Sequence, residues 1–461
     1  MTTGSRASLH ARLDAGRAQR SATPRRMLAL LSDRPNSYDP VERLRWQGEH
    51  RAADLLPLRY QRMLASPLAF YRGAALLMAD DLARGSSTSL EVQICGDAHL
   101  SNFGVFSSPE RRLVFDMNDF DETAPGPFEW DVKRLTASLA IASHHLGHDS
   151  RHQAKVVFEA AREYQRAMSR FAHEGRLDVW YASLNVESIL LELRGFLGDS
   201  ALRRVDDVVH RAKGMESRFV FKQMVTDGPH GPRIIANPPH VTPLSTMASG
   251  SLLSQNVIDP VLAGYRETLN SDRQALLAQF TPVDAARQVV GIGSVGTECY
   301  IILLVGRDDS DVMFLQVKAA TQSVVALARE FPTAVGPGER VVAGQRLMQA
   351  TPDVFLGWHT VGGTKSERGY YVRQLYDNKA SVRISELNAT QLEAYGRVCA
   401  WALARAHARS GHGAQIAGYL GRSERFAEAM VAFALAYRDR NSSDYRALTL
   451  AVERGTITAA S

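Results

Sequence analysis

The spacing of apolar and polar positions divides the chain into helical and β-rich segments. Apolar residues at helical spacing predict helices over four segments, residues 39–84, 130–213, 257–280 and 388 onward. Short runs of β-branched and aromatic residues predict strands at 92–94, at 113–117 and within 288–378. Ser66 and Pro67 favour a helix start at that point. The order of helices, polar β-hairpin, helices, small β-rich unit and helices indicates an α+β fold.

Composition changes this picture only at the N-terminus. Residues 1–26 carry six arginines and one aspartate, which accounts for the whole net charge of +5. The remaining chain is neutral, so we expect no nucleic-acid partner. A charged terminal segment is usually solvated. We therefore expect residues 1–38 to form a basic, poorly ordered arm.

Three cysteines, Cys95, Cys299 and Cys399, lie far apart in apolar surroundings. This pattern predicts buried free thiols in a reducing compartment. No apolar run approaches the roughly 18 residues of a membrane-spanning helix, and no secretory signal pattern is apparent. We expect a cytoplasmic protein with no transmembrane segment, and the oligomeric state stays open.

Candidate chemistry begins in "ICGDAHLSNFGVF", where Asp97, His99 and Asn102 follow a predicted strand. We call residues 95–102 the Asp97 loop. Phosphoryl transfer needs an acid that receives the proton of the nucleophile and oxygen ligands for Mg²⁺. The next segment, "LVFDMNDFDE", offers three further carboxylates, namely Asp116, Asp119 and Asp121. Residues 116–122 are called the acidic segment below.

Two other interpretations of this hairpin remain open. Asp and Asn residues often cap turns while their side chains face solvent. A binuclear phosphoesterase also begins with Gly-Asp-x-His, but it needs further Gly-Asp and Asn-His-Asp clusters to fill two metal sites. The sequence contains no such clusters, so phosphoryl transfer is favoured.

A glycine loop at residues 291–296 spells G-x-G-x-x-G, with Gly291, Gly293 and Gly296 around Ser294. In a dinucleotide-binding fold the third glycine opens a helix. Here "TECYIILLV", a turn and "VMFLQVK" predict two strands that end at Lys318. This order favours a kinase-type loop over nucleotide phosphates. A plain hairpin with a solvated lysine is the alternative.

The kinase-type interpretation assigns further nucleotide contacts. Lys318 is expected to contact the α- and β-phosphates and to pair with a helix carboxylate. Glu330 and Glu339 are both candidates for that support, and the sequence does not choose between them. "YYVRQLYDN" is interpreted as the strand that leads to a hinge, where the backbone near Gln374 and Leu375 would meet adenine.

These motifs resemble known families. "CGDAHLSN" resembles the His-Gly-Asp-x-His-x-x-Asn catalytic loop of aminoglycoside phosphotransferases and choline kinases, with Cys95 at the first histidine. "VFDMNDFDE…FEWDVKRL" resembles their metal motif and the later supporting aspartate, here Asp131. Spacing from Asn102 favours Asp116 as the metal carboxylate and spacing from Asp131 favours Asp119. Both are kept, Asp116 slightly ahead, with Asp121 as support.

Over nearly its whole length the chain resembles the bacterial domain-of-unknown-function 2252 family, which shares "GDAHLSNFG", "FDMNDFDET", "GIGSVGT" and "YYVRQL". The resemblance implies a protein-kinase-like bilobal fold in circularly permuted order. Residues 39–287 would form a helical large lobe that contains the catalytic hairpin at 90–122. Residues 288–378 would form the small, antiparallel β-rich nucleotide-binding lobe, and residues 379–461 would add helices that complete the large lobe.

The expected function is an ATP- and Mg²⁺-dependent phosphotransferase that acts on a hydroxyl of an unidentified small-molecule acceptor. The alternatives are a nucleotide-binding pseudokinase and an AMP transferase that uses the same cleft. Arg62 and Arg72 are candidates to hold phosphate or an acidic substrate, although structural ion pairing is slightly favoured for both. His407 is expected to be a packed helix residue.

Overall fold

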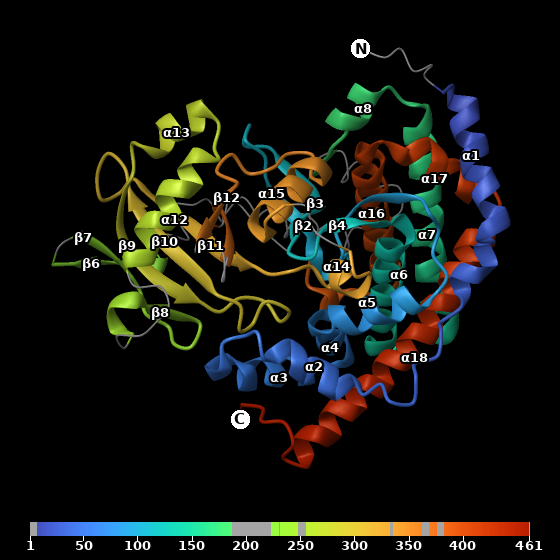
Figure 1. Cartoon of the computed structure of the whole chain (residues 1–461), viewed down its shortest axis with the longest axis horizontal. Coiled ribbons are helices and arrows are strands. Elements are labelled where there is room, and N and C mark those ends of the chain that lie inside the picture. The colour runs from blue at the N-terminus through green and yellow to red at the C-terminus, as the bar shows by residue number, and fades with distance from the viewer. Residues whose placement is uncertain are drawn as a thin grey trace.

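The computed structural model describes residues 7–186, 223–229, 231–247, 255–331, 335–361, 368–375 and 382–460. The predicted helical stretch at 187–213 and the end of the predicted hinge strand at 376–378 lie outside these ranges. Across the described chain the fold is α+β, with helices and several small antiparallel sheets. The largest sheet lies at one end of the molecule and most of the long helices lie at the other (Figure 1).

Six antiparallel strands form the largest sheet, in the order β12-β13-β11-β10-β9-β8. Their bounds are β8 Val241–Pro243, β9 Thr281–Gln288, β10 Cys299–Val305, β11 Val312–Ala320, β12 Gly357–Val361 and β13 Arg368–Gln374. In this register Lys318 on β11 pairs with Cys299 on one side and Tyr371 on the other. The register places Lys318 in the interior of the sheet.

Two helices cover one face of this sheet. They are α12 (Gln255–Glu267) and α13 (Ser271–Leu277), and their apolar residues share a core with β10, β11 and β13. Strand β9 begins directly after α13 and pairs with β10. The expected boundary at residue 288 therefore differs from the structure, because β8, α12, α13 and β9 all belong with the sheet. The sequence of β9 is polar and contains alanines, so it predicts a strand only weakly.

The remaining strands are short. They are β1 Glu91–Ile94, β2 Phe103–Ser107, β3 Leu113–Met117, β4 Ala124–Pro127, β5 Leu184–Asn185, β6 Val225–Gly228 and β7 Gly231–Ile234. The hairpin β2–β3 forms as predicted, with Phe103 opposite Met117. Strand β1 pairs with β4 rather than with this hairpin. The two pairings bring the Asp97 loop, which follows β1, next to the acidic segment, which runs from the end of β3 toward β4.

Helices make up the other end of the molecule (Figure 1). Those before β1 are α1 Leu9–Ala22, α2 Pro40–Gly48, α3 Leu56–Leu64, α4 Pro67–Gly73 and α5 Ala75–Arg84. The others are α6 Phe128–His145, α7 Ser150–His173, α8 Arg176–Tyr181, α14 Val324–Ala328, α15 Pro337–Met348, α16 Ala389–His407, α17 Gly413–Leu420 and α18 Arg425–Glu453. As predicted, α4 begins at Pro67 with Ser66 as its N-cap, and the Ser66 hydroxyl accepts from the Ala69 N–H.

The N-terminal segment differs from the expected poorly ordered arm. Residues 9–22 form α1, which packs so closely on α17 that a Cβ at Gly16 would lie 1.9 Å from the Gln415 carbonyl oxygen. Arg20 donates to the carbonyls of Gly418 and Tyr419, and Arg25 donates to that of Leu420. Cationic donors suit a helix C-terminus, where carbonyls lack partners within the helix. The arginines therefore hold the segment in place.

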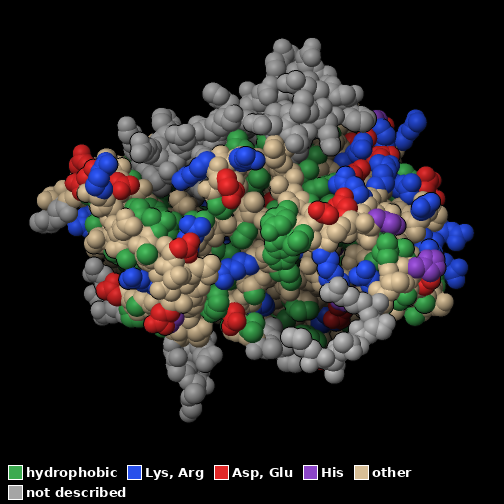
Figure 2. Space-filling model, turned by 90° about the horizontal axis from the view of Figure 1, so that it is seen from above, with side chains coloured by type: hydrophobic (Ala, Val, Ile, Leu, Met, Phe, Trp, Pro, Cys, Tyr) green, Lys and Arg blue, Asp and Glu red, His purple; other side chains and the backbone are tan. Residues whose placement is uncertain are grey.

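The structure bears on three features that composition addressed, namely the cysteines, membrane-spanning helices and surface charge. Cys95, Cys299 and Cys399 are buried and free. Within the described ranges no helix is both long and apolar enough to span a bilayer. Acidic and basic side chains are intermixed over the face drawn in Figure 2, with Lys and Arg gathered at the end where α1 and α7 lie.

Candidate functional site

Two adjoining cavities lie where the six-stranded sheet meets the Asp97 loop and the acidic segment. The large cavity has a volume of about 660 Å³, and Lys318 lines it. The small cavity has a volume of about 90 Å³, and Asp97 lines it. Asp119, Gly291 and Ser294 line both cavities. The two spaces therefore meet at the acidic segment and the glycine loop.

The backbone of the Asp97 loop is held by Asp131. The N–H groups of Cys95 and Gly96 donate to the two carboxylate oxygens of Asp131, at 2.6 and 2.9 Å. His407 Nε2 lies 3.2 Å from the same carboxylate, and the Tyr164 hydroxyl lies 2.8 Å from His407 Nδ1. Helices α6, α7 and α16 thus fix the loop through one carboxylate. His407 is fully buried, which confirms that it is a packed helix residue.

A glycine is required at the turn of this loop. Gly96 has φ +80°, and a Cβ there would lie 2.1 Å from the carbonyl oxygen of Glu122. Glu122 itself lines the small cavity, and its carboxylate accepts from the Val324 N–H at 2.7 Å. Burial raises the pKa of Glu122 to about 7. The loop and the acidic segment are therefore in backbone contact.

Asp97 lines the small cavity, and Arg134 engages one of its two oxygens. Arg134 Nε on α6 donates to Asp97 Oδ1 at 2.8 Å, and Nη2 lies 2.7 Å from the same oxygen. The other oxygen, Oδ2, lies 3.7 Å from His99 Nε2. Burial raises the pKa of Asp97, although Arg134 opposes the rise. A carboxylate that is oriented by Arg134 and has a raised pKa is suited to receive a proton.

Asn102 also lines the small cavity, and its amide orientation is defined by a hydrogen bond. Its Nδ2 donates to the backbone carbonyl of Asp97 at 2.9 Å. This bond uses the nitrogen end of the amide and leaves Oδ1 as the atom that could bind a metal. An amide oxygen is a suitable ligand for Mg²⁺.

Asp116 does not lie at the site, contrary to the slight preference drawn from spacing. It is buried on β3, and Arg405 Nη2 donates to its two oxygens at 2.6 and 2.7 Å. The N–H groups of Met117 and Ala350 also donate to it. Asp116 lines neither cavity. Its carboxylate joins β3 to α16, and a metal role would leave Arg405 without its counter-ion.

Asp119 is the better placed of the two metal candidates. It lines both cavities and forms no ion pair with any residue that the structure describes. Burial and the neighbouring Asp121 raise its pKa, against the pull of Lys318. A bound cation would stabilise the ionised form of Asp119 and so lower this pKa.

Lys318 pairs with Asp121, and not with Glu330 or Glu339. Its Nζ lies 2.6 Å from Asp121 Oδ2, and the Tyr371 hydroxyl donates to Asp121 Oδ1 at 2.5 Å. Burial would raise the pKa of Asp121, but the charge and hydrogen bond of Lys318 hold it at about 2. Glu330 is exposed after α14 and Glu339 lies in the first turn of α15. Neither glutamate forms an ion pair within the described ranges.

The glycine loop continues directly into a strand. After Gly296 the chain enters β10 at Cys299, with no helix between. This order contradicts the dinucleotide-binding alternative, which requires a helix to begin there. Gly291 and Gly296 have φ +67° and +85°. Such values favour glycine.

Two arginines from the helical part hold the glycine loop in place. Arg51 donates to the carbonyls of Gly293 and Val295, at 2.7 Å each. Arg62 donates to the carbonyl of Gly291 at 2.7 Å. Ser294 Oγ lies 3.5 Å from Lys318 Nζ. The loop therefore bridges the helices before β1 and the site of Lys318.

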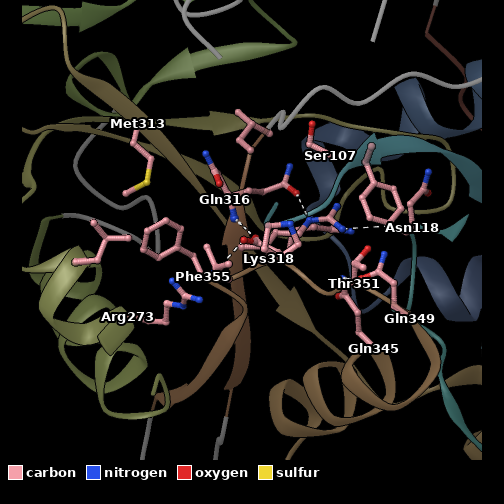
Figure 3. Close-up of a pocket in the computed structure, with 18 of the residues that line it drawn as sticks. Ser107, Asn118, Arg273, Met313, Gln316, Lys318, Gln345, Gln349, Thr351 and Phe355 are labelled. Atoms are coloured by element: carbon pink, nitrogen blue, oxygen red, sulfur yellow. Dashed lines mark hydrogen bonds between the residues drawn. The ribbon is translucent and has the colours of Figure 1, made fainter. Parts of the chain in front are cut away.

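Apolar and polar side chains both line the large cavity. In Figure 3 Met313 and Phe355 lie on one side of Lys318, together with Arg273, and Asn118 and Gln349 lie on the other. Pockets of roughly 300–1,000 Å³ are typical of small-ligand sites. The volume and the mixed lining suit a small ligand that carries both apolar and charged groups.

The predicted hinge contacts are not available in this conformation. Gln374 and Leu375 line the large cavity. The Gln374 N–H donates to the carboxylate of Asp353, and the Leu375 N–H donates to the Phe314 carbonyl at 3.0 Å. Neither N–H is free to bind adenine, because a side chain uses the first and a neighbouring strand uses the second. Any contact of Gln374 and Leu375 with a ligand would be made by other atoms of these residues.

Several residues at the site were missed by the sequence interpretation. Arg134 orients Asp97, and Arg405 neutralises Asp116. Arg340 on α15 donates to the backbone carbonyls of Asp121 at 2.8 Å and of Thr321 at 2.9 Å. Each of these arginines is distant in sequence from the group it contacts, so no local pattern indicated the pairs.

The residues at the junction of the cavities fit a magnesium ion. No group of three His, Cys, Asp or Glu side chains in the described ranges could hold a metal by itself. Asp119 at the junction and Asn102 in the small cavity offer two oxygen ligands. Mg²⁺ is commonly held by one or two protein oxygens together with substrate phosphates and water. The donor set is therefore of the right kind for Mg²⁺ with a nucleotide.

The chain belongs to the DUF2252 family, described as an uncharacterized protein conserved in bacteria, which it matches over residues 51–451. The matched range contains the Asp97 loop, the acidic segment, the glycine loop and Lys318. No curated protein and no solved structure matches the chain. The function must therefore be argued from the site.

Proposed function

We propose that this protein is an ATP- and Mg²⁺-dependent phosphotransferase that acts on a hydroxyl of a small molecule. The observation that carries the proposal is the junction of the two cavities. Lys318 and Asp119 line the large cavity, and Asp119 and Asp97 line the small one. A nucleotide in the large cavity would point its phosphates toward a hydroxyl beside Asp97. Phosphoryl transfer depends mainly on such positioning and on charge stabilisation.

Each wall of the large cavity has a role in this proposal. The base would lie against the apolar side chains of Met313 and Phe355, and the phosphates would lie beside Lys318. Ser294 and the glycine loop would contact the phosphates from the sheet side. Lys318 would divide its charge between Asp121 and the phosphates, since Nζ has three donors.

Asp97 would act as the proton acceptor. Arg134 holds Oδ1, so Oδ2 is the oxygen that would accept the hydroxyl proton. As the hydroxyl oxygen bonds to the γ-phosphorus, the bond from that phosphorus to the bridging oxygen would break and ADP would leave. Asp119 and Asn102 would hold Mg²⁺, which supplies charge neutralisation of the phosphates.

We further infer a kinase-like bilobal arrangement in circularly permuted order. A sheet that carries a glycine loop and an internal lysine faces a helical part that carries the Asp97 loop. In this chain the helical part with the Asp97 loop comes first and the sheet largely second. Permutation is tolerated when the new termini lie at the surface.

The first experiment measures Mg-ATP binding by isothermal titration calorimetry with the full chain. We expect binding with a Kd of about 1 mM or tighter, as is typical of enzyme substrates, and weaker binding without Mg²⁺. A folded protein that does not bind Mg-ATP at this concentration would contradict the proposal.

The second experiment follows ATP-dependent mass changes in a pool of small metabolites. We expect one or more compounds to gain a phosphate in the presence of the wild-type protein. Asp97→Asn should lower this rate by about 10²–10⁴-fold and leave Mg-ATP binding nearly unchanged. Gain of a nucleotide instead would indicate AMP transfer. ATP binding without any product would indicate a pseudokinase. In that case Asp97→Asn should leave every cellular effect of the protein unchanged.

A further inference from the structure

Arg72 brings to the small cavity a cation that has no ion-pair partner in the described part of the chain. Burial lowers its pKa, and the charges of Asp97 and Asp119 only oppose that effect. It lies on α4 and lines this cavity together with Asp97 and His99. Within the described ranges Arg72 forms no ion pair, and its Nε is buried without a hydrogen-bond partner. The slight preference for structural ion pairing is therefore not met at Arg72.

His99 provides a second unpartnered polar group in the same cavity. Its exposed fraction is only 3 %, and its Nδ1 has no hydrogen-bond partner among the described residues. A buried ring nitrogen without a partner can form a hydrogen bond with a bound ligand.

The nearby carboxylates do not supply the missing partner of Arg72. Asp97 is engaged by Arg134 and Asp121 is engaged by Lys318. Asp119 lies at the junction and is the candidate for the metal. A buried charge without a partner is costly, so a ligand that supplies the counter-ion would bind favourably.

The position of Arg72 separates this feature from the nucleotide phosphates. Arg72 lines the small cavity but not the large one, whereas Lys318 lines the large cavity but not the small one. Arg72 and Lys318 therefore lie in neighbouring cavities. A group bound by Arg72 lies on the Asp97 side of the junction, where the acceptor is expected.

We propose that the small cavity binds an anionic group of the acceptor, a carboxylate or a phosphate, with Arg72 as its ion-pair partner and His99 as a hydrogen-bond partner. The small volume of about 90 Å³ limits the bound part to a few heavy atoms. The acceptor class is therefore a small hydroxylated acid or phosphate monoester. Its role as acceptor rests on the proposed phosphotransferase function, whereas anion binding at Arg72 does not.

The test measures binding of three anions, inorganic phosphate, glycerate and glycerol 3-phosphate, to the full chain without nucleotide. Glycerol and ethanolamine serve as uncharged and cationic comparisons. We expect at least one anion to bind and both comparisons to bind more weakly. Arg72→Met should weaken anion binding by about ten- to a hundredfold, the range for hydrogen bonds to charged groups, and Arg72→Lys should retain part of it.

The matched control is Arg151→Met, which removes the same charge from an exposed position on α7. It should leave anion binding unchanged. Absence of binding by all three anions, or equal binding by wild type and a folded Arg72→Met variant, would overturn the inference.

A Mg-ATP titration of Arg72→Met separates this inference from the proposed function. We expect its affinity for Mg-ATP to match that of the wild type. A parallel loss of Mg-ATP affinity would assign Arg72 to the nucleotide phosphates and overturn the inference. If the wild type binds the anions but not Mg-ATP, the anion site stands and the phosphotransferase proposal fails.

Discussion

Lys318 Nζ lies 2.6 Å from Asp121 Oδ2, although 197 residues separate the two in the chain. The pair joins β11 of the large sheet to the acidic segment of the helical part. Tyr371 on β13 donates to the other oxygen of Asp121. Because Lys318 is almost fully buried, this contact aligns the sheet with the acidic segment at the junction of the cavities.

Lys318→Met is expected to weaken Mg-ATP binding by at least about tenfold, because charge-assisted hydrogen bonds to phosphate are among the stronger polar contacts. The matched control is Lys155→Met on α7, where the lysine is exposed and pairs with Glu393. Calorimetric titration of both variants checks the prediction. Equal Mg-ATP affinity in wild type and a folded Lys318→Met variant would remove Lys318 from the site.

Asp116 and Asp119 should respond differently to replacement by asparagine. Asp116→Asn should lower the free energy of unfolding by about 3–5 kcal/mol, because it leaves the buried Arg405 without its counter-ion. Asp119→Asn should leave stability nearly unchanged and reduce Mg²⁺-dependent nucleotide binding. Urea unfolding and titration of Mg²⁺ in the presence of ATP check the two expectations.

The opposite outcome for Asp116→Asn and Asp119→Asn would change the assignment of the metal carboxylate. If Asp116→Asn proved stable but lost Mg²⁺ dependence while Asp119→Asn retained it, the metal carboxylate would be Asp116. Such a result would require Arg405 to release Asp116 when nucleotide binds.

Lys133 should make the stability depend on pH. It is buried on α6, and burial lowers its pKa from 10.5 to about 8, against the attraction of Glu129. Between these values the unfolded chain binds more protons than the folded one, so stability rises with pH there. The cost of charging Lys133 is fully present below pH 8 and is relieved as the pH rises toward 10.5. At pH 7 this cost is about 3 kcal/mol.

Lys133→Met should therefore stabilise the protein at pH 7 by up to about 3 kcal/mol, and by about half as much near pH 9.5. Urea unfolding of both proteins at the two pH values checks this dependence. A variant that is less stable than the wild type by the same amount at both values would show that contacts of the ammonium with Glu129 and Phe433 outweigh its burial.

Gly16→Ala tests the docking of α1. A Cβ at Gly16 would meet the backbone of Gln415 on α17, so the two helices must separate. Alanine favours an isolated helix by about 1 kcal/mol over glycine, yet overpacking should lower stability by about 1–3 kcal/mol. Thermal unfolding measures the net loss, with Ala18→Ser on the exposed face of α1 as the control. A raised midpoint, as the helix propensity of alanine alone would give, would mean that α1 does not pack closely on α17.

Local features were accessible from the sequence because they depend on near neighbours. The hairpin β2–β3, the N-cap of α4 at Ser66 and the strand after Gly296 each follow from spacing and turn chemistry over a few residues. The family motifs identified the same segments. The α+β class follows from the order of these elements.

Pairs that are distant in the chain were not accessible in this way. Composition marked residues 1–38 as a solvated arm, yet Arg20 and Arg25 meet the free carbonyls at the end of α17. Strand β9 lacks a clear apolar alternation and is defined by its pairing with β10. In both cases a partner elsewhere in the fold overrides the local signal.

The sequence by itself determined which residue types the site contains, because the Asp97 loop, the acidic segment and the glycine loop are each contiguous. Only the tertiary structure decided their partners: Asp121 for Lys318, Arg405 for Asp116 and Arg134 for Asp97. The physical reason is that an ion pair depends on distance in space. Three carboxylates within six residues look equivalent in sequence, and the fold buries one against an arginine, pairs another with a lysine and leaves Asp119 at the junction of the cavities.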